Sequence, residues 1–436
     1  MKRRGLKPAP FKVGPDFIDP GHHAQVVGSK SRNLDGWMLS KKYNRDNFAK
    51  NTVNTDIALI EGVMGLFDGY DGKSEAGSTA QMAKWLGVPV LLIVDASSMA
   101  RSAAAIVRGF ENFDPDLCFA GVVFNRIGSS RHLTYLKEAL IDHVSMPVIG
   151  GMRRSESLAI PERHLGLVTK EDHHFTKAFL AKLADLIDKN LDLDRLLGIL
   201  PQISSFSPAP VISTPKATET CIGVARDAAF CFYYHENLEL LEQHGVQIKP
   251  FSPIKDGNLP KDIDGLYFGG GYPELYAHDL TQNTTLRKEI KAKSLKGMPI
   301  YGECGGLMYL GHAIFDLKGK IYPMTGCLPF STRMLPRLKR LGYREITLLG
   351  DTLIGSKGTV IRGHEFHYSE IIDDLKSVAT LYRVKDRIGM GHSTEGYQMN
   401  RTLGSYIHLH WGSCLKTAEA FAGTCRQYRK ERSLHA

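Results

Sequence analysis

Short apolar runs alternate with amphipathic stretches along the chain up to about residue 190. Apolar runs of strand length, separated by stretches with helical periodicity, are typical of βαβ units in a parallel sheet. The expected strands are residues 57–60, 88–94, 121–124 and 147–150, and the expected helices are residues 78–86, 96–110, 132–143 and 171–189.

A second α/β pattern begins after residue 220. Its expected strands are residues 222–225, 265–268 and 299–302, and its expected helices are residues 237–244 and 307–312. The stretch between the two patterns is rich in Pro, Ser and Thr, which is typical of a linker. We therefore expect an α/β domain at residues 1–200, a linker at 201–220, a second α/β domain at 221–416 and a C-terminal helix or tail at 417–436.

The composition is that of a globular protein. Of 436 residues, 43% are hydrophobic and 23% are charged, which excludes a disordered, collagen-like or coiled-coil chain. The net charge of +9 admits anionic partners. The basic cluster at residues 333–340 has no interleaved aromatic residues, so we do not expect nucleic acid as a partner.

The cysteines and the apolar runs bear on the compartment. None of the 7 cysteines belongs to a CxxC pair, so neither a disulfide framework nor a zinc site is indicated, and a reducing compartment fits. The longest strongly apolar runs, such as residues 88–94, are well short of the roughly 20 residues that a membrane helix needs. We expect a cytoplasmic protein without a membrane partner, for which a homodimer is admissible.

Residues 302–306 read Gly-Glu-Cys-Gly-Gly and come directly after an expected strand. Small residues around a nucleophile on a tight strand-to-helix turn define the G-x-S-x-G elbow, and this is its cysteine version. Such a turn presents the thiol at a helix N-terminus, where the helix dipole lowers its pKa. The pattern predicts that Cys304 is a nucleophile.

A glycine run at residues 269–271 follows another expected strand. Glycines let backbone N–H groups approach a small anion closely. We expect Gly270 and Gly271, together with the N–H of Gly305, to form an oxyanion hole.

A base for the thiol is expected at residues 405–410, which alternate like a strand. This pattern would place Tyr406, His408 and His410 on one face. Attack by cysteine needs an adjacent imidazole, so His408 is the expected base and His410 is the alternate candidate.

Together these motifs resemble a class I glutamine amidotransferase domain of the cobyrinate and cobyrate synthase type. The resemblance rests on Cys304 in its elbow, the preceding Gly-Gly-Gly-Tyr-Pro-Glu at 269–274 and the later Tyr-Ile-His-Leu-His at 406–410. Most class I glutaminases carry a glutamate two residues after the histidine, and this glutamate orients the imidazole. Position 410 is histidine instead, a departure that resembles the cobalamin-pathway subgroup.

Further segments resemble the cobyrinate a,c-diamide synthase family over nearly the whole chain. They are residues 11–20, 32–38, 60–69, 94–97, 100–103, 124–128, 160–166, 224–230, 341–343 and 363–369. The resemblance implies an N-terminal P-loop-NTPase-like parallel sheet, similar to dethiobiotin synthetase, and a C-terminal class I amidotransferase α/β domain.

Four residues of the first half are candidates for a nucleotide site with ATP and Mg²⁺. Glu61 ends an expected strand, where an open α/β sheet binds its ligand, and the resemblance assigns it to Mg²⁺. Lys12 and Asp16 lie in a Gly-Pro loop, where they can meet a phosphate and a metal or substrate respectively. The amide of Asn125, at the end of the strand 121–124, can pair with an adenine edge.

One departure from the family concerns the phosphates. The family begins with a strand and a G-x-x-x-x-G-K-[ST] loop whose amides hold ATP phosphates, and residues 1–436 contain no such motif. We therefore expect the first sheet to lack this strand and loop, through a misassigned start codon or a truncation. The expectation calls ATP turnover by the chain as written into question.

The resemblance implies ATP- and glutamine-dependent amidation of the a and c carboxylates of cobyrinate, through a cysteine thioester and an acyl phosphate. One alternative is the same chemistry on hydrogenobyrinate, nickel sirohydrochlorin or the later carboxylates that cobyrate synthase amidates. Another is a glutaminase or binding subunit whose ligase site is inactive or is completed by a separately encoded phosphate-loop peptide. His364 and His367 admit a metal interpretation, but they lack HExxH spacing, and we expect a polar strand or loop that contacts substrate.

Overall fold

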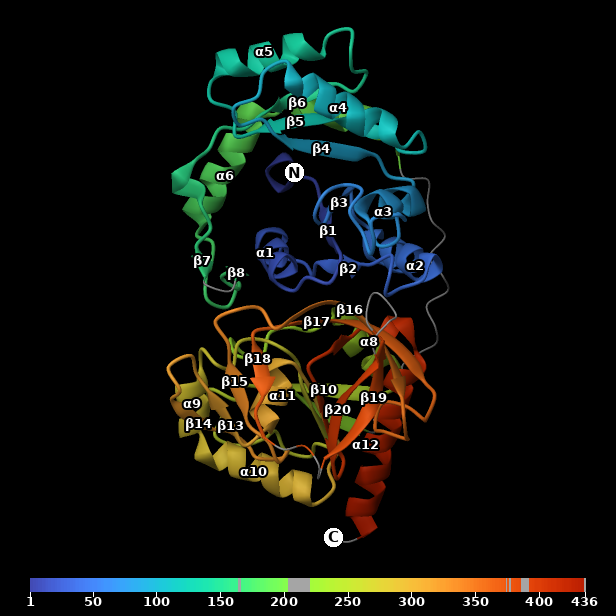
Figure 1. Ribbon diagram of the computed structural model, residues 1–436, viewed down its shortest axis with the longest axis vertical. Helices are drawn as coiled ribbons and strands as arrows, with labels where there is room; N and C mark the ends of the chain where they lie inside the picture. The colour runs from blue at the N-terminus through green and yellow to red at the C-terminus, as the bar shows by residue number, and fades with distance from the viewer. Residues whose placement is uncertain (164–165, 203–219, 374, 376–377, 386–391, 435–436) are drawn as a thin grey trace. The chain divides into compact units, whose positions relative to one another are not determined.

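The computed structural model describes residues 1–163, 166–202, 220–373, 375, 378–385 and 392–434 (Figure 1). Most of the predicted linker at 201–220 lies outside these residues. The described chain divides into two compact units, the first formed by residues 1–37 and 41–202 and the second by residues 38–40 and 220–434.

The first unit contains two parallel three-stranded sheets. One has the order β2-β1-β3, and the other has the order β4-β5-β6. The strands are β1 (Pro8–Val13), β2 (Arg32–Leu34), β3 (Ile57–Glu61), β4 (Val90–Asp95), β5 (Phe119–Asn125) and β6 (Val148–Gly151). The parallel α/β prediction is confirmed, but a single sheet was expected. Among the described residues, no strand pairs with the outer edge of β3 or of β4, so the six strands form two separate sheets.

Helices cover both sheets of this unit. They are α1 (Ile18–Val27), α2 (Lys41–Thr52), α3 (Thr79–Leu86), α4 (Ser102–Phe113), α5 (Ser130–Leu140), α6 (Lys177–Asn190) and α7 (Leu193–Ile199). Two short 3₁₀ turns and a two-stranded hairpin complete it: Lys2–Arg4, Glu156–Leu158, β7 (Glu162–Arg163) and β8 (Gly166–Leu167). Helix α3 belongs to both hydrophobic cores, since Met82 packs with the β1 sheet and Ala83 with the β4 sheet. One helix thus supports both sheets.

Two predicted helices begin later than expected. Helix α4 was expected from residue 96, but Asp95 accepts hydrogen bonds from the backbone N and the Oγ of Ser97 at 3.0 and 2.6 Å, which holds a turn. Helix α6 was expected from residue 171, but Thr176 caps it by accepting a bond from the N–H of Phe179 at 3.1 Å. Local side-chain bonds to the backbone compete with helix extension in both places.

The second unit contains a ten-stranded sheet of order β10-β9-β11-β12-β21-β20-β19-β16-β17-β22. The five strands from β10 to β21 are parallel, and the others are antiparallel. The strands are β9 (Thr220–Ala225), β10 (Val246–Phe251), β11 (Gly265–Phe268), β12 (Ile300–Glu303), β16 (Arg340–Leu348), β17 (Val360–His367), β19 (Ala379–Lys385), β20 (His392–Met399), β21 (Thr402–Ser405) and β22 (His408–Leu409).

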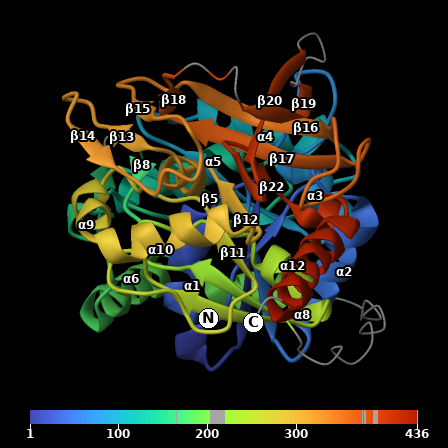
Figure 2. The ribbon, with the colours of Figure 1, turned by 90° about the horizontal axis from the view of Figure 1, so that it is seen from below.

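Helices and a smaller sheet flank this large sheet. The small sheet has the order β14-β13-β15-β18. Its strands are β13 (Ala313–Phe315), β14 (Ile321–Pro323), β15 (Thr332–Met334) and β18 (Ser369–Ile371), and the helices are α8 (His235–Gln243), α9 (Ala277–Gln282), α10 (Thr284–Leu295), α11 (Gly305–Leu310), the 3₁₀ turn η3 (Trp411–Ser413) and α12 (Lys416–Leu434). Helix α12 runs beside α8 (Figure 2), and both pack into the core with β9 and β11.

The predicted single strand at 405–410 is wrong. Strand β21 ends at Ser405, and the chain crosses to β22, where His408 pairs with His364 of β17. The crossing is held by Glu395, which accepts a hydrogen bond from the N–H of Tyr406 at 2.6 Å. Tyr406, His408 and His410 therefore do not share one strand face, and all three are buried.

Candidate active sites

Cys304 occupies a strained elbow between β12 and α11. Its φ of 49° and ψ of −104° lie outside the regions that most L-residues adopt, and its N–H donates to the carbonyl of Ser405 at 2.7 Å. A Cβ at Gly302 would lie 2.6 Å from Leu310, and one at Gly306 would lie 2.3 Å from the carbonyl oxygen of Phe268. The flanking glycines are therefore required by close packing.

The electrostatics of the thiol differ from the expectation. The helix dipole was expected to favour the thiolate, but burial raises the pKa of Cys304 well above its ordinary value, and the charge of Glu274 adds to this rise. The N–H of Gly305 acts in the opposite direction and does not outweigh burial. A base must therefore take the proton when the thiol attacks.

The glycine run lies against the elbow, as predicted, but Gly270 and Gly271 have different contacts. A Cβ at Gly305 would lie 3.1 Å from both the N and the O of Gly271, so these two backbones are in close contact. The N–H of Gly270 is directed elsewhere, since it donates to the carbonyl of Phe232 at 3.2 Å. Gly270 instead makes room for an imidazole, because its Cβ would lie 2.3 Å from Cε1 of His408. An oxyanion site here would use Gly271 and Gly305, and the role expected for the Gly270 N–H is corrected.

His408 and His410 have different surroundings. The ring of His408 lies beside Gly270 and stacks on His364, with 4.9 Å between centroids. Burial lowers its pKa to about 3, so the ring is neutral and able to accept a proton. Nδ1 of His410 instead accepts a hydrogen bond from the N–H of Gly412 at 3.1 Å and caps η3. The geometry favours His408 as the base.

A buried carboxylate that the sequence interpretation did not single out lies beside His408. Oε2 of Glu303 is 4.0 Å from Nδ1 of His408, and the two side chains are almost fully buried. Its only sequence signal is a charged residue at the end of an otherwise apolar strand, directly before the nucleophile.

The segment 363–369 spans the end of β17 and the start of β18 next to the thiol, and most of its side chains are buried. Sγ of Cys304 lies 3.9 Å from the carbonyl oxygen of Phe366. Glu365 accepts from Arg344 Nε at 2.7 Å and lies 2.9 Å from His367 Nε2. Within the described residues no group of three or more His, Cys, Asp or Glu side chains is arranged to hold a metal ion.

In the first unit, three of the predicted residues meet at the carboxyl ends of β1 and β3. Lys12, paired in register with Glu61, has its Nζ 3.4 Å from Glu61 Oε2 and 3.9 Å from Asp16 Oδ2. Two residues that sequence reasoning missed complete the cluster. Asp19 lies 2.7 Å from Lys12, and His23 lies 2.8 Å from Glu61. The available signal was a second aspartate three residues after Asp16, at the start of the predicted Gly-Pro loop's continuation into α1.

Charge is unevenly shared in this cluster. Burial, reinforced by repulsion from Asp19, raises the pKa of Asp16 to about 6. Burial also opposes ionisation of Asp19, but the hydrogen bond and charge of Lys12 outweigh it and leave the pKa of Asp19 lowered. Three carboxylates surround this ammonium, and one or two of them would be the usual protein share of a Mg²⁺ site that substrate phosphates complete. They do not form a complete metal cage.

Asn125 lies at the end of β5, in the other sheet of this unit. It pairs in register with Asp95, and its Oδ1 accepts a hydrogen bond from the N–H of Arg126 at 2.9 Å. The structure thus brings Asp16 and Glu61 close to the ammonium of Lys12. Asn125 lies on a different sheet.

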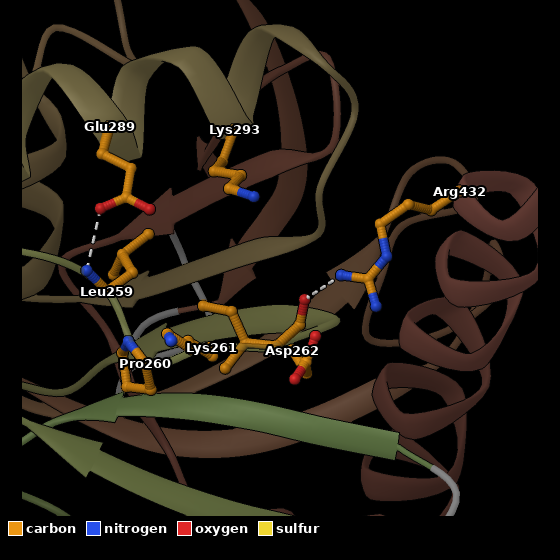
Figure 3. A pocket seen from close by; sticks show the side chains of 8 residues that line it. Leu259, Pro260, Lys261, Asp262, Glu289, Lys293 and Arg432 are labelled. Atoms are coloured by element: carbon orange, nitrogen blue, oxygen red, sulfur yellow. Dashed lines mark hydrogen bonds between the residues drawn. The ribbon is translucent and has the colours of Figure 1, made fainter. Parts of the chain in front are cut away.

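A cavity of about 410 Å³ in the second unit is not part of the thiol site (Figure 3). It is lined by the loop 259–263, by Glu289 and Lys293 of α10 and by Arg432 of α12. This loop leads into the amino end of β11, whereas the glycine run leaves its carboxyl end.

None of the helices in the described part of the chain is long and apolar enough to cross a membrane.

The chain matches two domain families. Residues 1–168 match the CobQ/CobB/MinD/ParA nucleotide binding domain, and residues 221–414 match the CobB/CobQ-like glutamine amidotransferase domain. The chain is 46% identical to the cobyrinate a,c-diamide synthase of Syntrophotalea carbinolica, over 98% of this chain and 94% of that protein. It is 42% identical to a cobyrinate a,c-diamide synthase of Dehalococcoides mccartyi, over 97% of this chain and 92% of that protein. It is also 42% identical to the cobyrinate a,c-diamide synthase of Salmonella typhimurium, over 94% of this chain and 90% of that protein.

Proposed function

Because the chain belongs to the cobyrinate a,c-diamide synthase family, we propose that it amidates the a and c carboxylates of cobyrinate in cobalamin biosynthesis, with nitrogen from glutamine and energy from ATP. The observation that carries the proposal is Cys304 in a strained elbow against Gly271, with the neutral ring of His408 beside the same glycine run. We assign the glutaminase to residues 221–416 and the ligase to residues 1–200.

In the glutaminase reaction the thiol of Cys304 attacks the glutamine carboxamide as His408 takes the thiol proton. The N–H groups of Gly271 and Gly305 bind the oxyanion that forms. Collapse of this intermediate breaks the C–N bond, and the amine leaves as ammonia with the proton held by His408. Water then hydrolyses the thioester, which releases glutamate and restores the thiol.

In the ligase reaction a carboxylate of the corrinoid attacks the γ-phosphate of ATP to give an acyl phosphate and ADP, and ammonia displaces the phosphate to give the amide. Lys12 would bind a phosphate, and Asn125 would bind the adenine. Glu61 and Asp16 would hold Mg²⁺, which supplies charge neutralisation of the phosphates when bound. The net charge of +9 suits the polycarboxylate substrate.

A second candidate is a glutaminase without ligase activity of its own. The division of the first unit into two sheets, whose edges at β3 and β4 find no partner among the described residues, favours it. Under this candidate the thiol site acts alone.

Separate assays of glutamate release and ADP formation on the full chain distinguish the two. The proposed synthase releases glutamate and forms ADP when cobyrinate is present, and its product has the mass of the diamide. Hydrogenobyrinate and nickel sirohydrochlorin are offered in parallel, and the preferred acid is the one amidated fastest. Glutamate release without ADP would leave only the second candidate.

The nucleophile is tested by Cys304→Ser, with Cys118→Ser as the matched control because Cys118 is an exposed free cysteine. Cys304→Ser is expected to abolish glutamate release, while Cys118→Ser keeps it. Equal rates in the two variants would refute the proposed glutaminase.

A further inference from the structure

Glu303 is a buried carboxylate with an unusually complete set of donors. Oε1 accepts hydrogen bonds from the hydroxyl of Tyr301 at 2.9 Å and from the N–H of Leu409 at 3.2 Å. Oε2 accepts from the hydroxyl of Tyr267 at 3.1 Å. A carboxylate that is 1% exposed is costly to keep charged without such bonds, so these donors offset part of the cost of holding an anion here.

The same carboxylate faces the imidazole edge that does not meet the thiol in the proposed reaction. Oε2 lies 4.0 Å from Nδ1 of His408, the ring nitrogen that is not the proposed proton acceptor. Catalytic hydrogen bonds are often long before substrate binds and shorten in the reactive complex. In most class I glutaminases a glutamate two residues after the histidine orients the ring, and here position 410 is a histidine whose Nδ1 caps η3.

We propose that Glu303, the residue directly before the nucleophile, is the positioning acid that orients His408 and stabilises its protonated form. This inference rests on the proposed glutaminase function. When the proton of Cys304 passes to Nε2 of His408, the ring becomes an imidazolium whose Nδ1–H donates to Oε2 of Glu303. The proton returns to the departing amine, so Glu303 stays ionised throughout.

The other groups around His408 do not supply this anion. His364 stacks on its ring and is buried, and His367 disfavours a positive charge on it. Glu365 favours the charge, but its carboxylate lies 2.7 Å from Arg344 and 2.9 Å from His367, so much of its field is compensated. Within the described part of the chain, Glu303 has three neutral donors and no hydrogen bond from a cationic side chain.

The protonation of Glu303 predicts a pH dependence of glutamate release that a general loss of structure would not produce. Burial raises the pKa of Glu303 to about 7, although its three donors oppose the rise. The rate of glutamate release should therefore fall as the pH drops through about 7, where the carboxylate takes up a proton and can no longer stabilise the imidazolium.

The experiment compares kcat, KM for glutamine and pH profiles of wild type and Glu303→Gln, measured as glutamate release. Glu303→Gln is expected to lower kcat by about 10²- to 10⁴-fold, the usual range for assistance to a proton transfer, and to remove the acidic limb near pH 7 while KM changes little. Tyr301→Phe removes one donor from Oε1, so it should move the acidic limb to higher pH while leaving the carboxylate in place. This second variant decides the question if Glu303→Gln does not fold.

Glu395→Gln is the matched control. Glu395 is also buried in this sheet with a raised pKa, about 8, but its bonds go to Ser405 and Tyr406. Its substitution should leave the limb near pH 7 in place. A wild type that releases no glutamate would overturn the proposed function and this inference together. An active wild type whose limb is unmoved by Glu303→Gln or Tyr301→Phe would overturn the inference alone.

Discussion

Gly270→Ala should disable the base without touching it chemically. The φ of Gly270 is not positive, so alanine meets no backbone strain there. Its Cβ would lie 2.3 Å from Cε1 of His408, whereas ordinary van der Waals contact begins at 3.4 Å. The neighbour is a side chain, so the ring must move by about 1 Å, and a displacement of that size in a catalytic group can cost about 10²-fold.

The assay is steady-state glutamate release, with thermal unfolding measured on the same samples. We expect kcat to fall about 10²-fold and the fold to persist, because the overlap is relieved by rotation of one ring. Gly257→Ala is the control, since this exposed glycine also has an ordinary φ and a Cβ there would meet nothing within 4 Å. A Gly270→Ala enzyme with the kcat of wild type would refute the placement of His408 as the base.

Three further substitutions test other parts of the structure. His410→Asn keeps an acceptor for the N–H of Gly412 and should retain glutamate release, whereas His408→Asn should abolish it; the reverse result would make His410 the base. Asp16→Asn should raise the unfolding temperature above about pH 6 but not below about pH 4. The pKa of Asp16 is about 6 in the folded state and 3.8 ordinarily, so its ionised form destabilises the fold. Equal shifts of the unfolding temperature at both pH values would contradict this. Ser78→Ala removes the cap that accepts from the N–H of Gln81 at 3.0 Å, and denaturant titration should show a loss of about 1 kcal/mol.

The parts of the fold that could be predicted are those fixed by local pattern. Strands β3, β9 and β11 begin and end close to their apolar runs, and the elbow at Cys304 follows from glycines whose absent Cβ atoms leave room for close backbone packing. These features depend on residues adjacent in the sequence, which is the information that periodicity and turn chemistry carry.

The parts that could not be predicted depend on contacts between distant residues. Residues 405–410 alternate like a strand, yet Glu395 binds the N–H of Tyr406 and turns the chain toward β17. In the same way, the spacing of Lys12 and Glu61 does not reveal that β1 and β3 are neighbours, so His23 was overlooked. Neither pairing has a local signature.

The location of the acid follows from where a buried charge can be held. Position 410 is fully buried with its ring 4.4 Å from the ring of Tyr234, so a carboxylate at this position would face an aromatic surface. Position 303 offers two tyrosine hydroxyls and one backbone N–H to the same kind of group. Since burying an ion without hydrogen bonds costs far more than burying one with them, this fold can keep its glutamate before the nucleophile and use His410 to cap η3.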